Sequence, residues 1–268
     1  MSIFFAGNQI SQRHGLFAPP APSFAGVVLN YLLVGGGGGG QDTQRVQYGT
    51  GGNGGQVING SGSFRTGYTY YIYVGSAGAS ARYGDGNSAT SNTEVADPTD
   101  GGNSQIYSSP YTNITAIGGN SGVTAQYQGT LLGNNIGGSG GNGITLPHND
   151  KYGFNGNYTQ LFGGDGIPII DFVTNLPIYY AAGGGGTYGN GGDDATTGGN
   201  GYDNYGSGGN AGSVGNTSNA EKGKQGVVKI MGSSSQFGQL GTFTPNTQRD
   251  VVGSNTILTF TGNGQFTI

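Results

Sequence analysis

Short apolar runs alternate with glycine-rich stretches along the chain, and this pattern predicts strands rather than helices. Runs rich in β-branched and aromatic residues, which favour extended chains, occur near residues 27–34, 68–74 and 226–231. No window shows the sustained 3.6-residue periodicity, with caps, that indicates an amphipathic helix. We therefore expect short β-strands at these places, negligible α-helix and an all-β or irregular fold class.

The glycine stretches are expected to be ordered. Glycine accounts for 61 of the 268 residues, with unbroken blocks at 35–40 and 183–186. The chain is 11% aromatic and only 8% charged, which is the opposite of a typical disordered composition. Collagen is excluded because there is no strict three-residue glycine period and there are only nine prolines. We expect extended or polyproline II glycine segments that pack against each other, so that valine at Gly184 or Gly185 would block folding.

Composition divides the chain into three parts. Residues 1–25 form a leader that ends in a proline-rich connector, 26–231 form the glycine-rich domain, and 232–268 form a Thr/Ser-rich segment. Near the C-terminus, alternating residues flank Gly262-Asn263-Gly264, a pattern that predicts a β-hairpin.

Residues with catalytic or metal-binding potential are sparse. The chain has no cysteine, and His14 and His148 lie in contexts without a catalytic partner pattern. Asp165 and the acidic pair at 193–194 match no calcium-loop spacing, so acidic turn residues are the better interpretation. The net charge of −4 provides no basic surface for nucleic acid. We expect no enzyme activity, no catalytic residues, no cofactor, no metal and no nucleic-acid partner.

Aromatic residues concentrate in the predicted loops at 103–113, 145–162 and 187–206. Tyrosine beside Asn, Ser and Gly is typical of recognition loops, because its ring offers a large rigid contact area and a hydroxyl group. The alternative is that these rings cover the edges of the glycine bundle. The candidate binding residues are Tyr107, Tyr111, Tyr152, Phe154, Tyr158, Tyr188, Tyr202 and Tyr205.

The order of the motifs resembles the glycine-rich domains of bacteriophage tail-fibre and tail-tip proteins, over about residues 27–231. The matching motifs are Leu-Leu-Val before the glycine run at 35–40, Gly-Gly-Asn-Gly-Gly-Gln-Val-Ile at 51–58, Tyr-Ile-Tyr-Val-Gly-Ser-Ala-Gly at 71–78, Gly-Gly-Asn-Ser at 101–104, Thr-Ala-Ile-Gly-Gly at 115–119 and Gly-Val-Val-Lys-Ile at 226–230.

The resemblance implies a virion protein that binds a bacterial receptor, either a polysaccharide or an outer-membrane protein. It also implies partners among the other tail or fibre proteins, and we consider a homo-oligomer such as a trimer. The apolar residues of the leader are candidates for virion attachment: Phe4, Phe5, Leu16 and Phe17. In the family, a Thr-Phe-Thr hairpin usually precedes the first glycine-run strand, whereas here that pattern lies at 259–267. It either folds back to complete the first sheet or pairs with another subunit.

Two other classes use glycine in this way. An ice-binding protein would show a regular Thr or Ala face at a three-residue period, and a structural coat protein would show near-exact repeats. This sequence shows neither pattern, which favours the adhesin.

Overall fold

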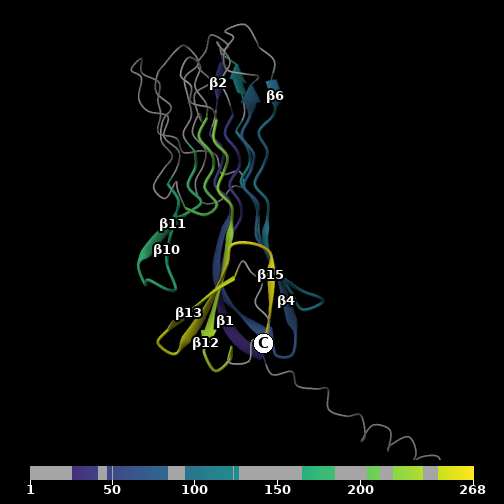
Figure 1. Cartoon of the computed structure of the whole chain (residues 1–268), viewed down its shortest axis with the longest axis vertical. Helices are drawn as coiled ribbons and strands as arrows, with labels where there is room; N and C mark the ends of the chain where they lie inside the picture. The colour runs from purple at the N-terminus through teal and green to yellow at the C-terminus, as the bar shows by residue number, and fades with distance from the viewer. Residues whose placement is uncertain are drawn as a thin grey trace, which may run out of the picture.

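The computed structural model describes residues 26–41, 47–49, 51–83, 94–122, 124–126, 165–184, 204–211, 220–237 and 247–268. Throughout these residues the chain is all-β, with antiparallel strands and no helix, as expected. Figure 1 shows an elongated molecule with a body of β-sheets at one end. Long extended segments rise from this body along the long axis.

Two sheets make up the body, and three two-stranded ribbons lie outside these two sheets in the described residues. The five-stranded sheet has the order β13 (Thr247–Val252), β14 (Asn255–Phe260), β12 (Val227–Ser233), β1 (Gly26–Val34) and β3 (Val57–Arg65). The four-stranded sheet has the order β15 (Gly264–Thr267), β4 (Thr69–Tyr73), β7 (Ser104–Ser108) and β8 (Thr112–Ala116). The two-stranded ribbons are β10 (Ile167–Ile170) with β11 (Pro177–Tyr180), β2 (Gln47–Gly49) with β9 (Thr124–Gln126), and β5 (Arg82–Tyr83) with β6 (Glu94–Ala96). The strands expected near 27–34, 68–74 and 226–231 are confirmed as β1, β4 and β12.

The core of the body lies between the two sheets. Leu29 and Leu33 of β1 are buried in one cluster with Tyr70 and Ile72 of β4, because alternate side chains of each strand point to the same side. Phe266 of β15 stacks on Tyr70 with ring centroids 5.1 Å apart. The result is a β-sandwich with an aromatic interior.

The glycine run at 35–40 continues β1 and forms the centre of the extended bundle. Its amides donate in rotation to three segments: Gly35 and Gly38 to 51–56, Gly36 and Gly39 to 97–103, and Gly37 and Gly40 to 220–226. Three further segments donate to its carbonyls: 117–122 to Gly36 and Gly39, 75–81 to Gly37 and Gly40, and 206–211 to Gly38. A rotation of three residues per turn is the geometry of a polyproline II helix, here with six neighbours.

Every residue of the run has to be glycine because there is no room for a side chain. A Cβ atom on Gly36 would lie 2.0 Å from the carbonyl oxygen of Ser76, and one on Gly38 would lie 2.0 Å from that of Asn120. The Cα hydrogens therefore face carbonyl oxygens, a contact that contributes about 0.5–1 kcal/mol. A Cβ atom on Gly184, at the edge of the described residues, would lie 2.1 Å from the carbonyl oxygen of Gly209. Gly185 lies outside the described residues.

The outer segments need glycine only where they face the centre. In the segment 220–226, Ala220, Gly223 and Gly226 are buried, whereas Glu221, Lys222 and Gln225 are exposed. This local period of three follows from the threefold helix, since one residue per turn faces inward. The exposed positions of this segment are charged or polar and do not form a Thr or Ala face.

The prediction of a C-terminal hairpin around Gly262-Asn263-Gly264 is wrong, because the two strands on either side do not pair with each other. β14 pairs with β12 and so extends the sheet of β1, whereas β15 pairs with β4 in the other sheet. Phe260 and Phe266 both fill the core between the sheets, so the chain has to cross from one sheet to the other between them. The true hairpin joins β13 to β14 through Gly253, whose φ of +60° suits glycine.

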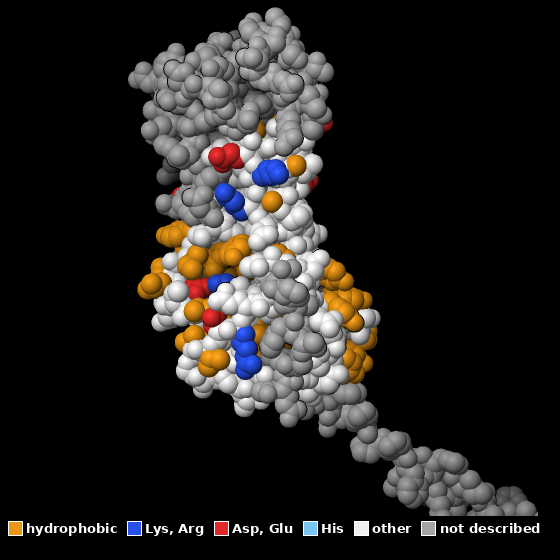
Figure 2. Space-filling model, in the orientation of Figure 1, with side chains coloured by type: hydrophobic (Ala, Val, Ile, Leu, Met, Phe, Trp, Pro, Cys, Tyr) orange, Lys and Arg blue, Asp and Glu red, His pale blue; other side chains and the backbone are white. Residues whose placement is uncertain are grey.

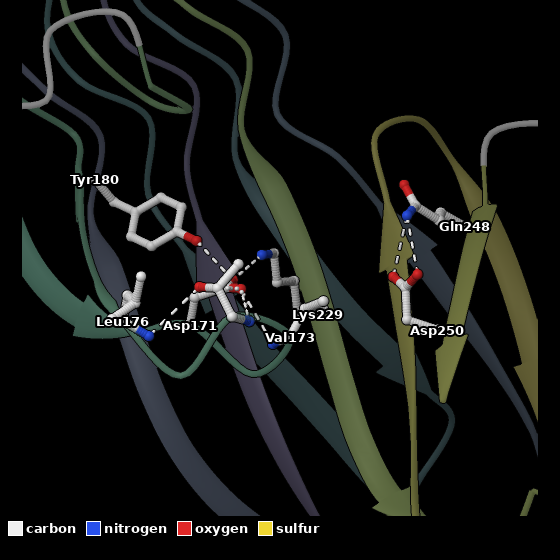
Figure 3. Close-up of polar contacts among 8 residues, drawn as sticks. Asp171, Val173, Leu176, Tyr180, Lys229, Gln248 and Asp250 are labelled. Atoms are coloured by element: carbon white, nitrogen blue, oxygen red, sulfur yellow. Dashed lines mark hydrogen bonds and ion pairs between the residues drawn. The ribbon is translucent and has the colours of Figure 1, made fainter. Parts of the chain in front are cut away.

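A buried ion pair fixes the β10–β11 ribbon to the body. Lys229 of β12 pairs with Asp171, which follows β10, and the hydroxyl of Tyr180 also donates to Asp171 (Figure 3). The other carboxylate oxygen of Asp171 accepts hydrogen bonds from the amides of Val173 and Thr174, at 3.1 and 3.0 Å. Burial alone would raise the pKa of Asp171, but these hydrogen bonds and the charge of Lys229 outweigh it and lower the pKa.

The direction of this shift predicts an acid-labile contribution to stability. Because the folded-state pKa of Asp171 lies below its ordinary value of 3.8, the carboxylate stabilises the fold above that pH. The contribution is lost as the pH falls through the folded-state pKa. We expect the free energy of unfolding of Asp171→Asn to fall less between about pH 5 and about pH 2 than that of the unchanged chain, as measured by urea unfolding. Equal pH slopes for the two proteins would contradict this prediction.

Candidate functional site

The outer side of the four-stranded sheet carries a group of exposed tyrosines. Alternation along β4 buries Tyr70 and Ile72 and turns Tyr71 and Tyr73 outward, where they are 46% and 45% exposed. Tyr107 of β7 is 36% exposed and lies directly opposite Tyr71 in the register. Figure 2 shows hydrophobic side chains, tyrosine included, gathered on the side where Figure 1 places β4.

Amide side chains lie in the same rows as these rings. Gln265 of β15 lies opposite Tyr71 on one side, Asn113 of β8 lies opposite Tyr107 on the other, and Gln105 lies opposite Tyr73. We call the surface formed by these six residues the tyrosine face: Tyr71, Tyr73, Gln105, Tyr107, Asn113 and Gln265.

The amides of the tyrosine face retain hydrogen-bonding capacity. Gln105 Nε2 donates to Asn113 Oδ1 at 2.6 Å, and Thr115 Oγ1 donates to the same oxygen at 3.1 Å. These bonds orient the Asn113 amide and leave its Nδ2 without a partner among the described residues. The side chain of Gln265 likewise has no hydrogen-bond partner among the residues that the structure describes. The face can therefore both donate and accept hydrogen bonds to a ligand.

The support beneath the face is rigid. Both central strands, β4 and β7, pair on each side, and the buried Ile72 and Ile106 anchor them in the core. Tyrosine itself has few rotatable bonds, so ordering its ring on binding costs little entropy. Exposed rings on a well-supported sheet form an arrangement that suits binding.

Of the predicted binding residues, Tyr107 and Tyr111 belong to the four-stranded sheet and its β7–β8 turn. The ring of Tyr111 carries the guanidinium of Arg65 3.8 Å from its centroid and packs edge-on against Tyr68 at 5.1 Å. A hydrogen bond with Tyr111 also raises the pKa of Tyr68. Tyr111 is thus partly occupied by contacts within the chain, whereas Tyr107 faces solvent.

Tyr205 lies apart from them. It is half-buried and packs against the cluster of Val34, Tyr180 and Val227 at the base of the glycine bundle. This position matches the alternative that some rings cover the bundle. The remaining predicted residues lie outside the described residues: Tyr152, Phe154, Tyr158, Tyr188 and Tyr202 for binding, and Phe4, Phe5, Leu16 and Phe17 for attachment.

Tyr71 and Tyr73 are not among the residues predicted from the sequence to bind, because that prediction named aromatic residues of loops and these two lie in strand β4. The signal was present in Tyr70-Tyr71-Ile72-Tyr73, since a strand with aromatic or apolar residues at consecutive positions cannot bury both of its sides in one core.

Comparison with family models assigns residues 21–232 to the glycine-rich domain family, and the chain belongs to that family. Neither the curated proteins nor the solved structures include a match. Among the described residues there is no cluster of three or more His, Cys, Asp or Glu suited to a metal ion. The same residues include no helix that is long and apolar enough to span a membrane.

Proposed function

We propose that this chain is a non-enzymatic virion protein, a tail-fibre or tail-tip adhesin that recognises the surface of a bacterial host. The observation that carries the proposal is the tyrosine face, an exposed group of aromatic and amide side chains on a sheet whose central strands are paired on both sides. Tyrosine-rich surfaces of this kind are typical of recognition sites. The resemblance of the motif order to phage tail proteins supplies the setting.

The glycine bundle suits this role because it supplies length and stiffness. Successive amides of the central run are tied to different neighbours, so no single segment can shift without breaking bonds to several others. The tyrosine face lies on the body, next to the point where the leader joins β1, so the bundle extends beyond this face and does not carry it. The loops at 145–162 and 187–206 remain candidates for additional contacts.

The proposal is tested by locating the chain and measuring its binding. We expect antibodies against the chain to label the tail of intact particles in electron micrographs. We also expect the purified full chain to sediment with cells of at least one species in a panel of bacteria. Absence from particles would refute the virion assignment, and failure to bind any cells would refute the adhesin.

The leader is proposed as the attachment to other tail or fibre proteins. Deletion of residues 1–22 is expected to leave a folded domain that no longer enters particles, because Phe4, Phe5, Leu16 and Phe17 are removed. Comparing the protein composition of purified particles from both genotypes measures this effect. Normal incorporation of the shortened chain would contradict the role of the leader. Sedimentation equilibrium of the same proteins tests for a trimer.

The alternatives are distinguished by other properties. Ice binding predicts thermal hysteresis of the purified chain, and a coat protein predicts self-assembly without binding to cells. The exposed Glu221 and Lys222 on the bundle do not favour an ice-binding surface.

A further inference from the structure

We propose that the tyrosine face binds a neutral glycan, whose sugar rings lie across the rows of tyrosine and amide side chains. This inference rests on the proposed function and specifies its ligand class. It concerns residues of β4, β7, β8 and β15, and of the eight aromatic residues predicted to bind, these strands hold only Tyr107.

The composition of the face matches the two surfaces of a sugar. A pyranose ring presents C–H groups on its flat side, which stack on aromatic rings, and hydroxyl groups at its edge, which exchange hydrogen bonds with amides. Tyr71, Tyr73 and Tyr107 supply the rings. Asn113 and Gln265 supply donors and acceptors at the two ends of the Tyr71–Tyr107 row.

The spacing of the rings suits a chain of sugars rather than a single one. Directly opposite residues such as Tyr71 and Tyr107 have Cβ atoms about 4.5–5.5 Å apart. Tyr71 and Tyr73, two residues apart on one strand, are separated by about 6.6–6.8 Å. The three tyrosines are therefore distributed over an area that is wider than one sugar ring both along and across the strands.

The charge of the face selects among glycans. None of the six residues of the tyrosine face is Lys, Arg or His, so nothing in it compensates for carboxylate or phosphate groups. Arg65, at the end of β3 in the other sheet, lies over the ring of Tyr111. An acidic polysaccharide would favour a surface with Lys or Arg. Amides flank the rings, with Gln265 and Asn113 at the ends of one row and Gln105 opposite Tyr73, so that both stacking and hydrogen-bonding groups meet a sugar. A protein receptor is the outcome that the periodate and protease test below distinguishes.

The direct test uses a microarray of purified bacterial polysaccharides, some neutral and others acidic, probed with the full chain. We expect binding to neutral members, with a signal that is insensitive to raising NaCl from about 0.1 to 1 M, because no charges are screened. Titration calorimetry with the best neutral polysaccharide then compares Tyr71→Thr/Tyr107→Thr with the unchanged chain. Threonine keeps the strand preference, and we expect affinity to fall at least tenfold.

Tyr179→Thr is the matched control, because Tyr179 is a tyrosine of β11 that is 38% exposed and lies outside the tyrosine face. It should bind like the unchanged chain, and all variants should unfold at similar temperatures. Preference for acidic polysaccharides, no binding to any neutral one, or unchanged affinity of the double variant would overturn the proposal.

Cell binding separates this inference from the adhesin itself. Periodate cleaves the vicinal diols of sugars, and protease removes surface proteins. Binding that is lost after periodate and survives protease supports the glycan. Binding that survives periodate and is lost after protease leaves the adhesin standing and overturns the glycan. If no cells bind, the adhesin fails, and the array still decides whether the tyrosine face binds glycans.

Discussion

Gly38→Ala is expected to abolish folding of the chain. The added Cβ would lie 2.0 Å from the carbonyl oxygen of Asn120 and 2.4 Å from its carbon, and these are backbone atoms that cannot rotate away. Relief would require moving the central run, whose Gly38 amide is bonded to Asn53 and whose Gly38 carbonyl accepts from Gly209. We expect a loss of more than about 4 kcal/mol, which is a large part of the 5–15 kcal/mol of a typical domain.

Gly62→Ala provides the control for this prediction. Gly62 lies in β3, where a Cβ would meet only the rings of Tyr31 and Phe64, at ordinary contact distances of 3.5 and 3.7 Å. This variant should fold and melt within a few degrees of the unchanged chain, as measured by circular dichroism. A cooperative melt of Gly38→Ala near the same temperature would show that the bundle is not packed as described.

Lys229→Met is expected to cost about 3–5 kcal/mol of unfolding free energy. The substitution keeps an unbranched side chain but leaves the Asp171 carboxylate buried without its cation. The ion pair that joins the β10–β11 ribbon to β12 would be lost. The Asp171 carboxylate would keep the hydrogen bond from the Tyr180 hydroxyl, but its negative charge would no longer be compensated. Chemical denaturation at neutral pH measures the cost.

The double variant Lys229→Met/Asp171→Leu tests the cause. Replacing both partners by apolar residues removes the unpaired charge, and such replacements of buried pairs are often neutral or stabilising. We therefore expect the double variant to be more stable than Lys229→Met alone. A single variant that costs less than about 1 kcal/mol, or a double variant that is less stable than the single one, would contradict this account.

The sequence was sufficient to predict the strands of the body and the packing of the glycine segments. β1, β4 and β12 each combine β-branched or aromatic residues with a glycine segment at the end next to the bundle, and this pattern is local. The close packing follows from the absence of side chains in 35–40, since only backbone contacts can stabilise such a run. The six-neighbour arrangement could not be predicted, because it depends on which distant segments meet the run.

The pairing of the C-terminal strands shows where local patterns fail. Alternation around Gly262-Asn263-Gly264 correctly indicates strands on both sides but does not specify their partners. β15 pairs with β4 because Phe266 fills the core beside Tyr70 and Asn263 accepts a hydrogen bond from the amide of Val74. These contacts join residues that are far apart in the sequence.

The candidate site was only partly predictable for a related reason. Tyr107 was predicted as a loop residue because it lies among Asn, Ser and Gly residues, but the structure places it on strand β7. The tyrosine face exists only because β4 and β7 pair in a register that sets Tyr71 opposite Tyr107. Sequence alternation gives the side of the strand but not the neighbour across the sheet.

Competition for adsorption is the most direct measurement of the central claim, that the tyrosine face contacts the host. Host cells are saturated with purified chain, particles are added, and unadsorbed particles are counted over time. The account predicts that the unchanged chain and Tyr179→Thr slow adsorption, whereas Tyr71→Thr/Tyr107→Thr does not. Equal blocking by the double variant, or no blocking by the unchanged chain, would contradict the claim.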